Sequence, residues 1–323
     1  MRKIVFLVLS LFFAFKVSAQ TTAADASVTE SAVTLKTLYG SISGTLTVPN
    51  NASGKIPVVI IMADNGPTDR DGNNAERGIN ANTYKLLAYA LGKNGIASLR
   101  YDKRLVGQSV TTEKEKQLSF EDYTDDAVSL IGMLNDDQRF SKIIIAGHGD
   151  GALAGMLATG DEPISEYISL EGSAETGEKI MTDKMKQGPS YLADEFKTIL
   201  DSLRRGKTTD DVDPALYHVA RTSIQPYIMS WCRYDPIREI KKLKMPVLLI
   251  QGTTDLEVSA DNGLKLNKAK ANAILKVIRG MNYVLKDAPA DKDANLATYK
   301  NPDLPLNKEM VQDIVDFING VKD

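Results

Sequence analysis

The residues best able to do chemistry stand where predicted strands end. The stretch 143–155, IIIAGHGDGALAG, is an apolar run that ends in a Gly-rich turn and continues as a small-residue helix. Polar residues also follow the strands predicted before 63–74 (ADNGPTDRDGNN), 251–259 (QGTTDLEVS) and 279–286 (RGMNYVLK). Ligands of open α/β sheets bind beyond the carboxyl ends of the strands. We therefore expect these four segments to meet in one site.

The turn at 147–151, Gly-His-Gly-Asp-Gly, has the spacing of the sharp strand-to-helix turn that presents a nucleophilic serine, G-x-S-x-G. Position 149 is glycine, which has no nucleophilic atom. Asp255 follows a later buried strand, and the segment 279–286 follows the last one. The chain order is nucleophile position, acid position, base position, which is the order in α/β-hydrolases.

Alternating strands and helices are expected to position these segments. An antiparallel pair of strands is predicted in 33–50, because Thr and Val alternate there with a period of two. The remaining strands are predicted at 55–63, 96–102, 142–147, 163–172, 245–255 and 273–280, and the helices at 83–95, 119–137, from 151, 261–272 and 307–320. This order predicts a mostly parallel sheet covered by helices on both faces. The alternation of strands and helices is interrupted at about 174–236, which predicts an inserted helical cap.

The sequence resembles the exported bacterial α/β-hydrolases of the carboxylesterase and serine-aminopeptidase-like type over roughly 35–321. Members of that family typically read Gly-Ser-Gly-Pro-Thr-Asp-Arg-Asp-Gly where this chain has DNGPTDRDG, and Gly-His-Ser-x-Gly at the turn. The stretches LRYDKR, MSWCRYDP, VLLIQGTTDLEVS and GMNYVLK extend the resemblance. The resemblance implies the α/β-hydrolase fold and, by family, carboxylic ester hydrolysis.

Two departures from the family affect the catalytic triad. The family's serine falls on Gly149 and its histidine falls on Tyr283, so that Asp255 alone remains, as the acid. The serine oxygen attacks the substrate and the imidazole takes its proton. A phenol with a pKa near 10 is a poor base at neutral pH. The triad mechanism therefore cannot run in this chain.

Ligand-binding groups of the family's site are expected to remain. The backbone N–H of Asp150 and one from the Asp64–Asn65 turn are predicted to converge as an oxyanion-type hole at a helix start. A carboxylate at Asp64 would oppose an anion there. Residues 69–71, Asp-Arg-Asp, are interpreted as an ion-paired turn that braces the loop.

Gly149 should suit the turn, because the apex of such a turn has positive φ, which glycine adopts without strain. We expect the Tyr283 ring to lean toward the space that the serine would fill, with its hydroxyl bonded to Asp255. His148, His218, Ser173 and Asp150 are candidate substitute catalytic groups; each also has an ordinary structural interpretation.

Composition limits the classes of function. The 323 residues are 43% hydrophobic and 25% charged, with a formal net charge of −3 and no basic block, which argues against a nucleic-acid partner. A single cysteine, Cys232, excludes an intrachain disulfide. Two histidines and no cysteine cluster argue against a metal site, and no cofactor is predicted.

The N-terminus predicts export. MRK, an apolar run and the small residues VSA form a signal peptide at 1–19, with cleavage after Ala19. We expect a flexible leader at 20–32 and the hydrolase-fold domain at 33–323. No cysteine follows the apolar run, so neither a lipid anchor nor a stable membrane anchor is expected, and a bacterial periplasmic or secreted location is predicted.

Three functions remain open. The first is a catalytically impaired pseudo-hydrolase that binds a small acyl-, ester- or peptide-like ligand. The second is an active or residual carboxylic ester hydrolase that uses a non-standard site. The third is a structural or interaction protein.

Overall fold

The structure, a computed structural model, describes residues 27–321. The predicted signal peptide 1–19 and the first part of the predicted leader lie outside the described residues. The first described strand begins at Val28, so the predicted leader boundary at residue 32 is wrong. Val28 is buried and residues 29–32 are exposed; this segment is extended because it pairs with the next strand rather than through any alternating apolar pattern of its own.

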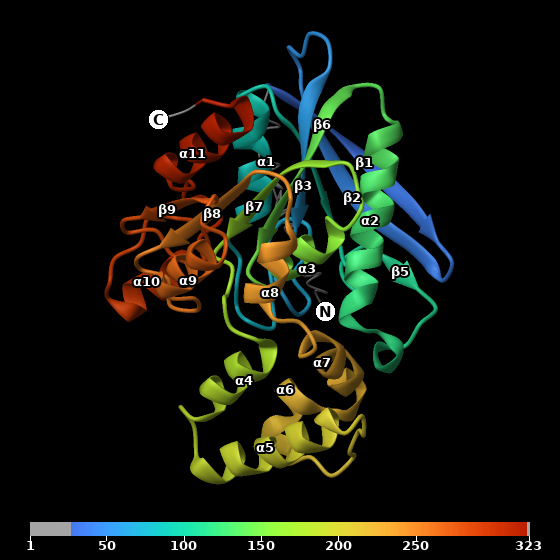
Figure 1. Cartoon of the computed structure of the whole chain (residues 1–323), viewed down its shortest axis with the longest axis vertical. Helices are drawn as coiled ribbons and strands as arrows, with labels where there is room; N and C mark the ends of the chain where they lie inside the picture. The colour runs from blue at the N-terminus through green and yellow to red at the C-terminus, as the bar shows by residue number, and fades with distance from the viewer. Residues whose placement is uncertain (1–26, 322–323) are drawn as a thin grey trace, which may run out of the picture.

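One mixed sheet forms the centre of the molecule (Figure 1). Its strands lie in the order β1-β2-β4-β3-β6-β7-β8-β9, and β5 pairs with β2. The strands are β1 (Val28–Thr37), β2 (Gly40–Pro49), β3 (Ile56–Met62), β4 (Ala97–Tyr101), β5 (Val110–Thr111), β6 (Phe140–His148), β7 (Ile164–Leu170), β8 (Val247–Gly252) and β9 (Ile274–Ile278). The predicted strands are confirmed, and the short β5 was not predicted.

The two halves of the sheet differ in direction and in burial. β1 and β2 form an antiparallel ladder from Val28↔Pro49 to Thr37↔Gly40, as the Thr/Val alternation predicts. From β4 to β9 the neighbouring strands run parallel. Strands covered on both faces read as continuous apolar runs, and the β3 residues Val58, Val59 and Ile60 are fully buried.

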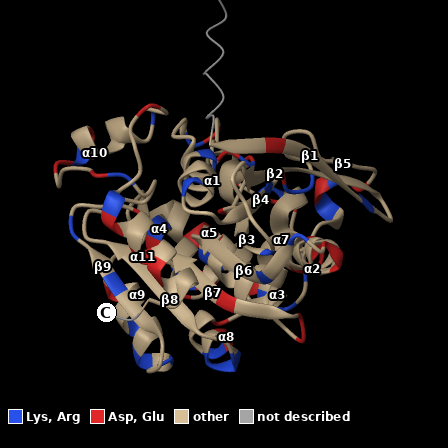
Figure 2. Cartoon of the chain, turned by 90° about the horizontal axis from the view of Figure 1, so that it is seen from above, with Lys and Arg blue, Asp and Glu red and all other residues tan. Residues whose placement is uncertain are grey.

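Helices cover both faces of the sheet. α1 and α11 contact one face, whereas α2, α3, α8 and α9 pack on the other (Figure 2). The helices are α1 (Thr83–Lys93), α2 (Phe120–Asp136), α3 (Asp150–Ala158), α4 (Gly177–Met185), α5 (Ser190–Arg204), α6 (Tyr217–Ala220), α7 (Gln225–Trp231), α8 (Pro236–Lys242), α9 (Asp261–Ala269), α10 (Lys292–Thr298) and α11 (Lys308–Asn319). The short α8 and α10 were not predicted separately. The predicted α/β class is confirmed.

Helices α4 to α7 fall within the predicted cap, 174–236, and form a lobe apart from the sheet in Figure 1. Their apolar faces pack into a small core of their own around Phe196, Leu200 and Ile228. Several contacts tie this lobe to the body; among them, the Phe120 N–H donates to Ser230 Oγ (2.7 Å), and an Arg221 guanidinium pairs with a carboxylate preceding α2.

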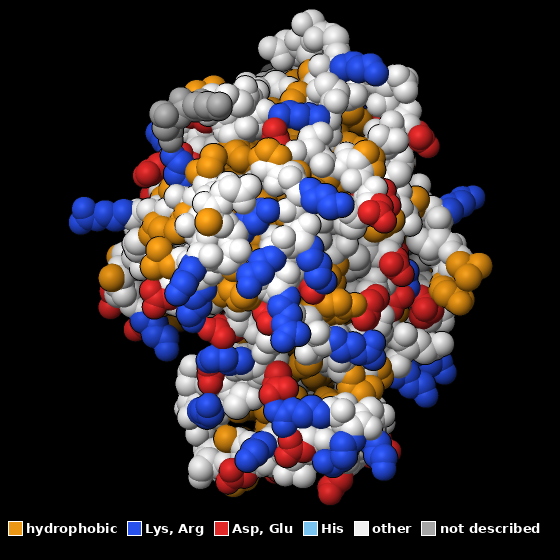
Figure 3. Space-filling view, in the orientation of Figure 1, with side chains coloured by type: hydrophobic (Ala, Val, Ile, Leu, Met, Phe, Trp, Pro, Cys, Tyr) orange, Lys and Arg blue, Asp and Glu red, His pale blue; other side chains and the backbone are white. Residues whose placement is uncertain are grey.

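The surface carries both charge signs interspersed, as Figure 3 shows for one face. Within residues 27–321, no helix is both long enough and apolar enough to cross a membrane. The same part of the chain holds no group of three or more His, Cys, Asp or Glu side chains that could bind a metal ion.

Candidate active site

The predicted turn is present at the junction of β6 and α3. β6 ends at His148, α3 begins at Asp150, and Gly149 between them has φ 56° and ψ −120°. A side chain at such a φ is strained, so glycine relaxes the turn as the sequence predicts. At Gly151 a Cβ atom would lie 2.4 Å from the Met62 carbonyl oxygen, so that helix α3 can approach β3 only with glycine there.

The space of the missing serine is occupied. A Cβ atom built on Gly149 would lie 2.1 Å from Tyr283 Oη and 2.3 Å from Asp64 Oδ1. Real Cβ atoms essentially never approach other heavy atoms that closely. Glycine at 149 is therefore required by its neighbours as well as by the backbone.

The Asp64 carboxylate is the group that fills this space, and each of its oxygens is held. Oδ1 accepts the backbone N–H of Asp150 (3.1 Å), and Oδ2 accepts Arg77 Nη1 (2.6 Å). The Tyr283 hydroxyl is also hydrogen-bonded to this carboxylate. Burial alone would raise the pKa of Asp64, but Arg77 and these hydrogen bonds hold it below the usual value. Asp64 is therefore a buried anion at neutral pH.

The predicted oxyanion hole thus contains an internal carboxylate. The Asp150 N–H, one of its two expected donors, points at Asp64 Oδ1. The backbone N–H of Asp64 itself donates to Tyr84 Oη (3.0 Å), and the Asn65 side chain donates to Asp150 Oδ2 (2.8 Å). An anionic intermediate would have to compete with the Asp64 carboxylate for the Asp150 N–H, which gives a physical reason to expect that Asp64 opposes a bound anion.

Tyr283 leans into the vacated space, as expected, and is only 4% exposed. Its expected bond to Asp255 is wrong, because the hydroxyl binds Asp64 instead. Burial raises the pKa of the Tyr283 phenol well above its usual value, and the Asp64 carboxylate raises it further. The Arg77 guanidinium carbon lies 5.5 Å from the centre of the ring and covers it.

Asp255 is bonded to other groups. Its Oδ1 accepts the N–H groups of Glu257 (2.6 Å) and Val258 (3.0 Å), which fixes the loop after β8. Its other oxygen faces Glu171, a fully buried residue with φ 48° at the end of β7. Sequence analysis did not single out Glu171, although its place directly after a buried strand was a usable signal.

Asp255 and Glu171 form a carboxyl pair that holds a proton. Both Glu171 oxygens and Asp255 Oδ2 are buried without a well-formed donor among the described residues, apart from the other carboxyl. Burial and the neighbouring Asp255 raise the pKa of Glu171 well above its usual value, and burial raises that of Asp255 to about 6. Two carboxyls in contact cannot both ionise cheaply. The acid of the expected triad therefore serves a second carboxyl instead of a histidine.

Three of the candidate substitute groups have structural positions. His148 is buried: its Nδ1 lies 2.9 Å from Tyr84 Oη, and its Nε2 lies 2.8 Å from the Tyr283 carbonyl oxygen, so it braces the Tyr283 backbone. Ser173 Oγ accepts the Glu175 N–H (3.0 Å), as a turn serine does. His218 is exposed on the cap.

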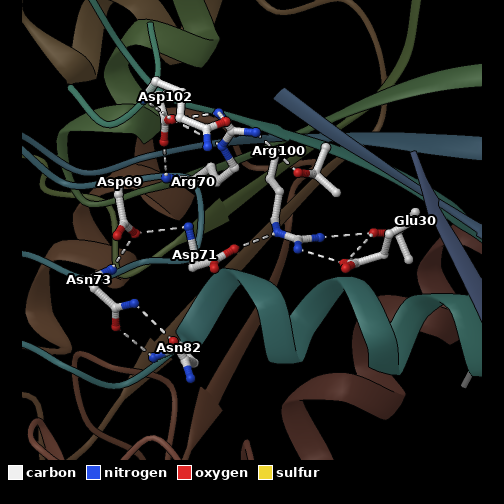
Figure 4. Close-up of polar contacts among 11 residues, drawn as sticks. Glu30, Asp69, Arg70, Asp71, Asn73, Asn82, Arg100 and Asp102 are labelled. Atoms are coloured by element: carbon white, nitrogen blue, oxygen red, sulfur yellow. Dashed lines mark hydrogen bonds and ion pairs between the residues drawn. The ribbon is translucent and has the colours of Figure 1, made fainter. Parts of the chain in front are cut away.

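Loop 69–71 is braced by ion pairs, as interpreted from the sequence, but its charges pair with residues in and just after strand β4 rather than with one another (Figure 4). Arg70 pairs with Asp102 at 2.6 Å, and Asp71 pairs with Arg100 at 3.0 Å. Arg100 is 3% exposed and also pairs with a carboxylate of β1. The loop that carries Asp64 is thereby anchored to the sheet.

On the side of the turn that faces the cap, the Asp150 side chain is partly exposed. Burial, together with the Asp64 charge, raises the pKa of Asp150 to about 7, and burial lowers that of Lys103 to about 8. Lys103 Nζ donates to the Asp64 carbonyl oxygen and lies 5.6 Å from the centre of the Tyr123 ring. Tyr227 of α7 meets Tyr123 edge to face at 5.7 Å. The hydroxyls of Tyr123 and Tyr227 have no hydrogen-bond partner in the described chain.

Replacing Glu171 by Gln tests the carboxyl pair. Both folded-state pKa values lie above the ordinary 4.5 and 3.8, so the stability that the pair supports is present below pH 4 and is lost as the pH rises through 6. We expect Glu171→Gln to become more stable than the wild type, by on the order of 2 kcal/mol, between pH 4.5 and 7.5. Urea unfolding at several pH values measures this. Exposed Asp161→Asn serves as control, and a difference independent of pH would contradict the pair.

Replacing Arg77 by Met tests the charge balance at Asp64. Removing one partner of a buried ion pair leaves an uncompensated charge, so we expect a loss of about 3 kcal/mol. Asp64→Asn in the same chain should recover most of it. The matched control is Arg139→Met, which breaks an exposed pair of the same 2.6 Å length and should cost less than about 1 kcal/mol. Equal losses at the two arginines would contradict the buried-anion assignment.

Comparisons with known proteins agree with this geometry. Residues 77–172, which include the turn at Gly149 but neither Asp255 nor Tyr283, match the family described as serine aminopeptidase, S33. The esterase EstD of Thermotoga maritima is 25% identical over 256 residues, which are 76% of this chain and 58% of that protein. The chain therefore spans less than two thirds of the length of this curated relative.

Solved structures show the same fold. Est1E from Butyrivibrio proteoclasticus with bound ferulic acid superposes with a TM-score of 0.59 at 19% identity, covering 90% of this chain and 100% of that one. An esterase from Pyrococcus furiosus gives 0.58 at 15% identity, covering 91% and 92%. An α/β-hydrolase from Penicillium sp. sh18 gives 0.59 at 14%, covering 90% and 98%. The chain thus has the α/β-hydrolase fold, as its motifs predict, and it is similar in sequence to an esterase.

Proposed function

We propose that this chain is a catalytically silent α/β-hydrolase that binds a small acyl-, ester- or peptide-like ligand without cleaving it. One observation carries the proposal: the Asp64 carboxylate and the Tyr283 hydroxyl fill the place of the nucleophile at Gly149. A serine hydrolase needs both an attacking oxygen and an empty oxyanion hole. This site has neither.

No neighbouring group restores the missing functions. The base position holds a buried phenol whose raised pKa keeps it protonated. Asp255 shares a proton with Glu171 and has no imidazole to orient. These observations support the proposal that no acyl transfer through a covalent intermediate occurs at this turn.

A binding surface facing the cap supports a retained ligand site. Asp150, Asn65, Tyr123 and Tyr227 are all partly exposed, and two phenol hydroxyls there are free to bond a ligand. Aromatic faces with a few convergent polar groups are typical of small-molecule sites. The esterase relative and the ferulic acid in the Est1E structure support an ester or carboxylic acid as the kind of ligand to try.

Residual hydrolysis by a non-standard route is the second candidate. Asp150 is partly exposed, and its pKa of about 7 suits a general base that activates water. Such a reaction would form no acyl-enzyme, and Asp150→Asn would abolish it. A structural or interaction role is the remaining alternative.

The wild-type protein distinguishes these candidates. We expect no labelling by a fluorophosphonate probe and no hydrolysis of methyl ferulate above a heat-denatured control, together with a rise in melting temperature when methyl ferulate is added. Turnover lost in Asp150→Asn would favour the second candidate. Absence of both turnover and stabilisation across a panel of acyl esters and dipeptides would favour an interaction role.

Rebuilding the triad tests the cause of silence. Because a serine at 149 would still meet the Asp64 carboxylate after the Tyr283 ring is removed, we expect Gly149→Ser with Tyr283→His to stay inactive. Adding Asp64→Gly vacates the hole, and hydrolysis of p-nitrophenyl acetate should then rise by on the order of 10²-fold. The rate should stay modest, because Asp255 remains paired with Glu171.

The control for the rebuilt chain carries Ala instead of Ser at 149, with the same changes at 64 and 283. It should fold equally well and remain inactive. Full activity already in the two-site variant would show that Asp64 does not obstruct the site.

Export is part of this proposal. The signal peptide predicted at 1–19 supports export to the bacterial periplasm or outside the cell, and we propose no membrane anchor, nucleic-acid partner or cofactor. Cell fractionation with an antibody to the mature chain tests the location.

A further inference from the structure

A cavity of about 700 Å³ lies outside the turn at Gly149, and nothing in the proposed function uses it. It opens between the loop that follows β3, the loop that follows β4, and the end of α10. Its lining residues are Pro67, Asp69, Asn73, Ala75, Gly78, Ile79, Asn80, Leu105, Val106, Gly107 and Lys300. None of these belongs to the turn at Gly149 or to the remaining triad positions. The volume lies in the range of small-molecule sites.

The walls are mainly apolar, and one of them is strained. Leu105 has φ 62°, yet its side chain is 49% exposed and lines the cavity. A bulky residue at positive φ costs on the order of 1–3 kcal/mol, and such strain collects at functional sites. Because the Leu105 side chain is half exposed, the free energy gained from its burial does not offset the cost of its backbone conformation. Ile79 and Val106 supply further apolar surface and are each 8% exposed.

The rest of that loop is held firmly in place. Asp102 accepts the Gln108 N–H (2.8 Å), and a Cβ atom at Gly107 would lie 2.2 Å from Asp102 Oδ2. The Val106 N–H bonds the Lys103 carbonyl oxygen (3.0 Å). The strained leucine is thus presented by a rigid loop.

Two oppositely charged side chains in the lining, Lys300 and Asp69, can each form a further polar contact with a ligand. Lys300 is exposed and has no carboxylate partner within residues 27–321. Asp69 Oδ1 accepts the N–H groups of Asp71 and Asn73, each at 2.9 Å, whereas its Oδ2 has no partner in the described chain. The Asn73 amide oxygen is already taken by two backbone N–H groups of the next loop. A ligand therefore finds one free cation and one free carboxylate oxygen.

We propose that this cavity binds a small zwitterion with an apolar side chain, of the size of an amino acid or a dipeptide. The ligand carboxylate pairs with Lys300, its ammonium group bonds Asp69 Oδ2, and its side chain packs on Leu105, Ile79 and Val106. A simple fatty acid would leave Asp69 facing an apolar group, and a simple amine would leave Lys300 unpaired. The site is independent of the proposed function at Gly149.

Calorimetric titration of the full chain with L-leucine and L-leucyl-L-leucine tests the proposal. At least one of them should bind. Removing the ligand's ammonium charge (N-acetyl-L-leucine) or its carboxylate (L-leucinamide) should each weaken binding about tenfold or more. Equal binding of either leucine analogue, or no binding of either probe to folded protein, overturns the proposal.

Variants assign the ligand groups. Lys300→Met should weaken binding about tenfold, whereas Lys292→Met should not, because Lys292 is an exposed lysine at the start of α10, the helix that ends just before Lys300. Asp69→Asn keeps an oxygen for the loop and should weaken the binding of L-leucine. Unchanged affinity in Lys300→Met and Asp69→Asn overturns the assignment.

Leu105→Gly separates binding from folding. Glycine tolerates φ 62°, so this variant should melt at or above the temperature of the wild type while binding the probe more weakly. Unchanged affinity in this variant would show that Leu105 is not part of the site.

Discussion

The hydrogen bond from the Asp150 backbone N–H to the Asp64 carboxylate is the contact on which the rest of the site depends. In a working serine hydrolase such an N–H meets an oxygen that becomes negative during the reaction. Here the negative charge is permanent and covalently attached to the loop after β3. Arg77 balances that charge, and the Tyr283 hydroxyl completes its hydrogen bonds. The N–H that would stabilise a transient anion in such an enzyme is here bonded to a carboxylate of the chain itself.

The carboxylate at the acid position, Asp255, is also compensated by a neighbouring group of the chain. A triad aspartate normally finds its compensation in an imidazole, and this chain has none there. Asp255 meets Glu171 instead, and the shared proton removes one of two charges that burial would otherwise make costly. The loop held by Asp255 carries Glu257, which pairs with Arg77 at 3.2 Å. Arg77 therefore links the loop of the acid position, through Glu257, to Asp64 in the oxyanion hole.

The sequence predicted the sheet, most helices and the meeting of four strand ends, because apolar runs and periodicity are local properties. It also identified Gly149 and Tyr283 as departures. It misassigned the partner of Tyr283, because which carboxylate a phenol reaches depends on side-chain packing between distant loops. Arg77 carried no motif at all. The strand at 28–32 was missed because it is defined by its neighbour in the sheet rather than by its own residue types, whereas Glu171 was missed although it directly follows a buried strand.

The three changes at positions 64, 149 and 283 constrain one another. Glycine at 149 leaves room that an aspartate and a tyrosine fill, and once they fill it, a Cβ atom at 149 no longer fits. Reversing any one of them alone creates a collision, an unpaired buried charge or an empty space, each of which costs stability. Such a site is stable against single substitutions toward activity. The proposed silence therefore rests on packing and charge as well as on the missing nucleophile.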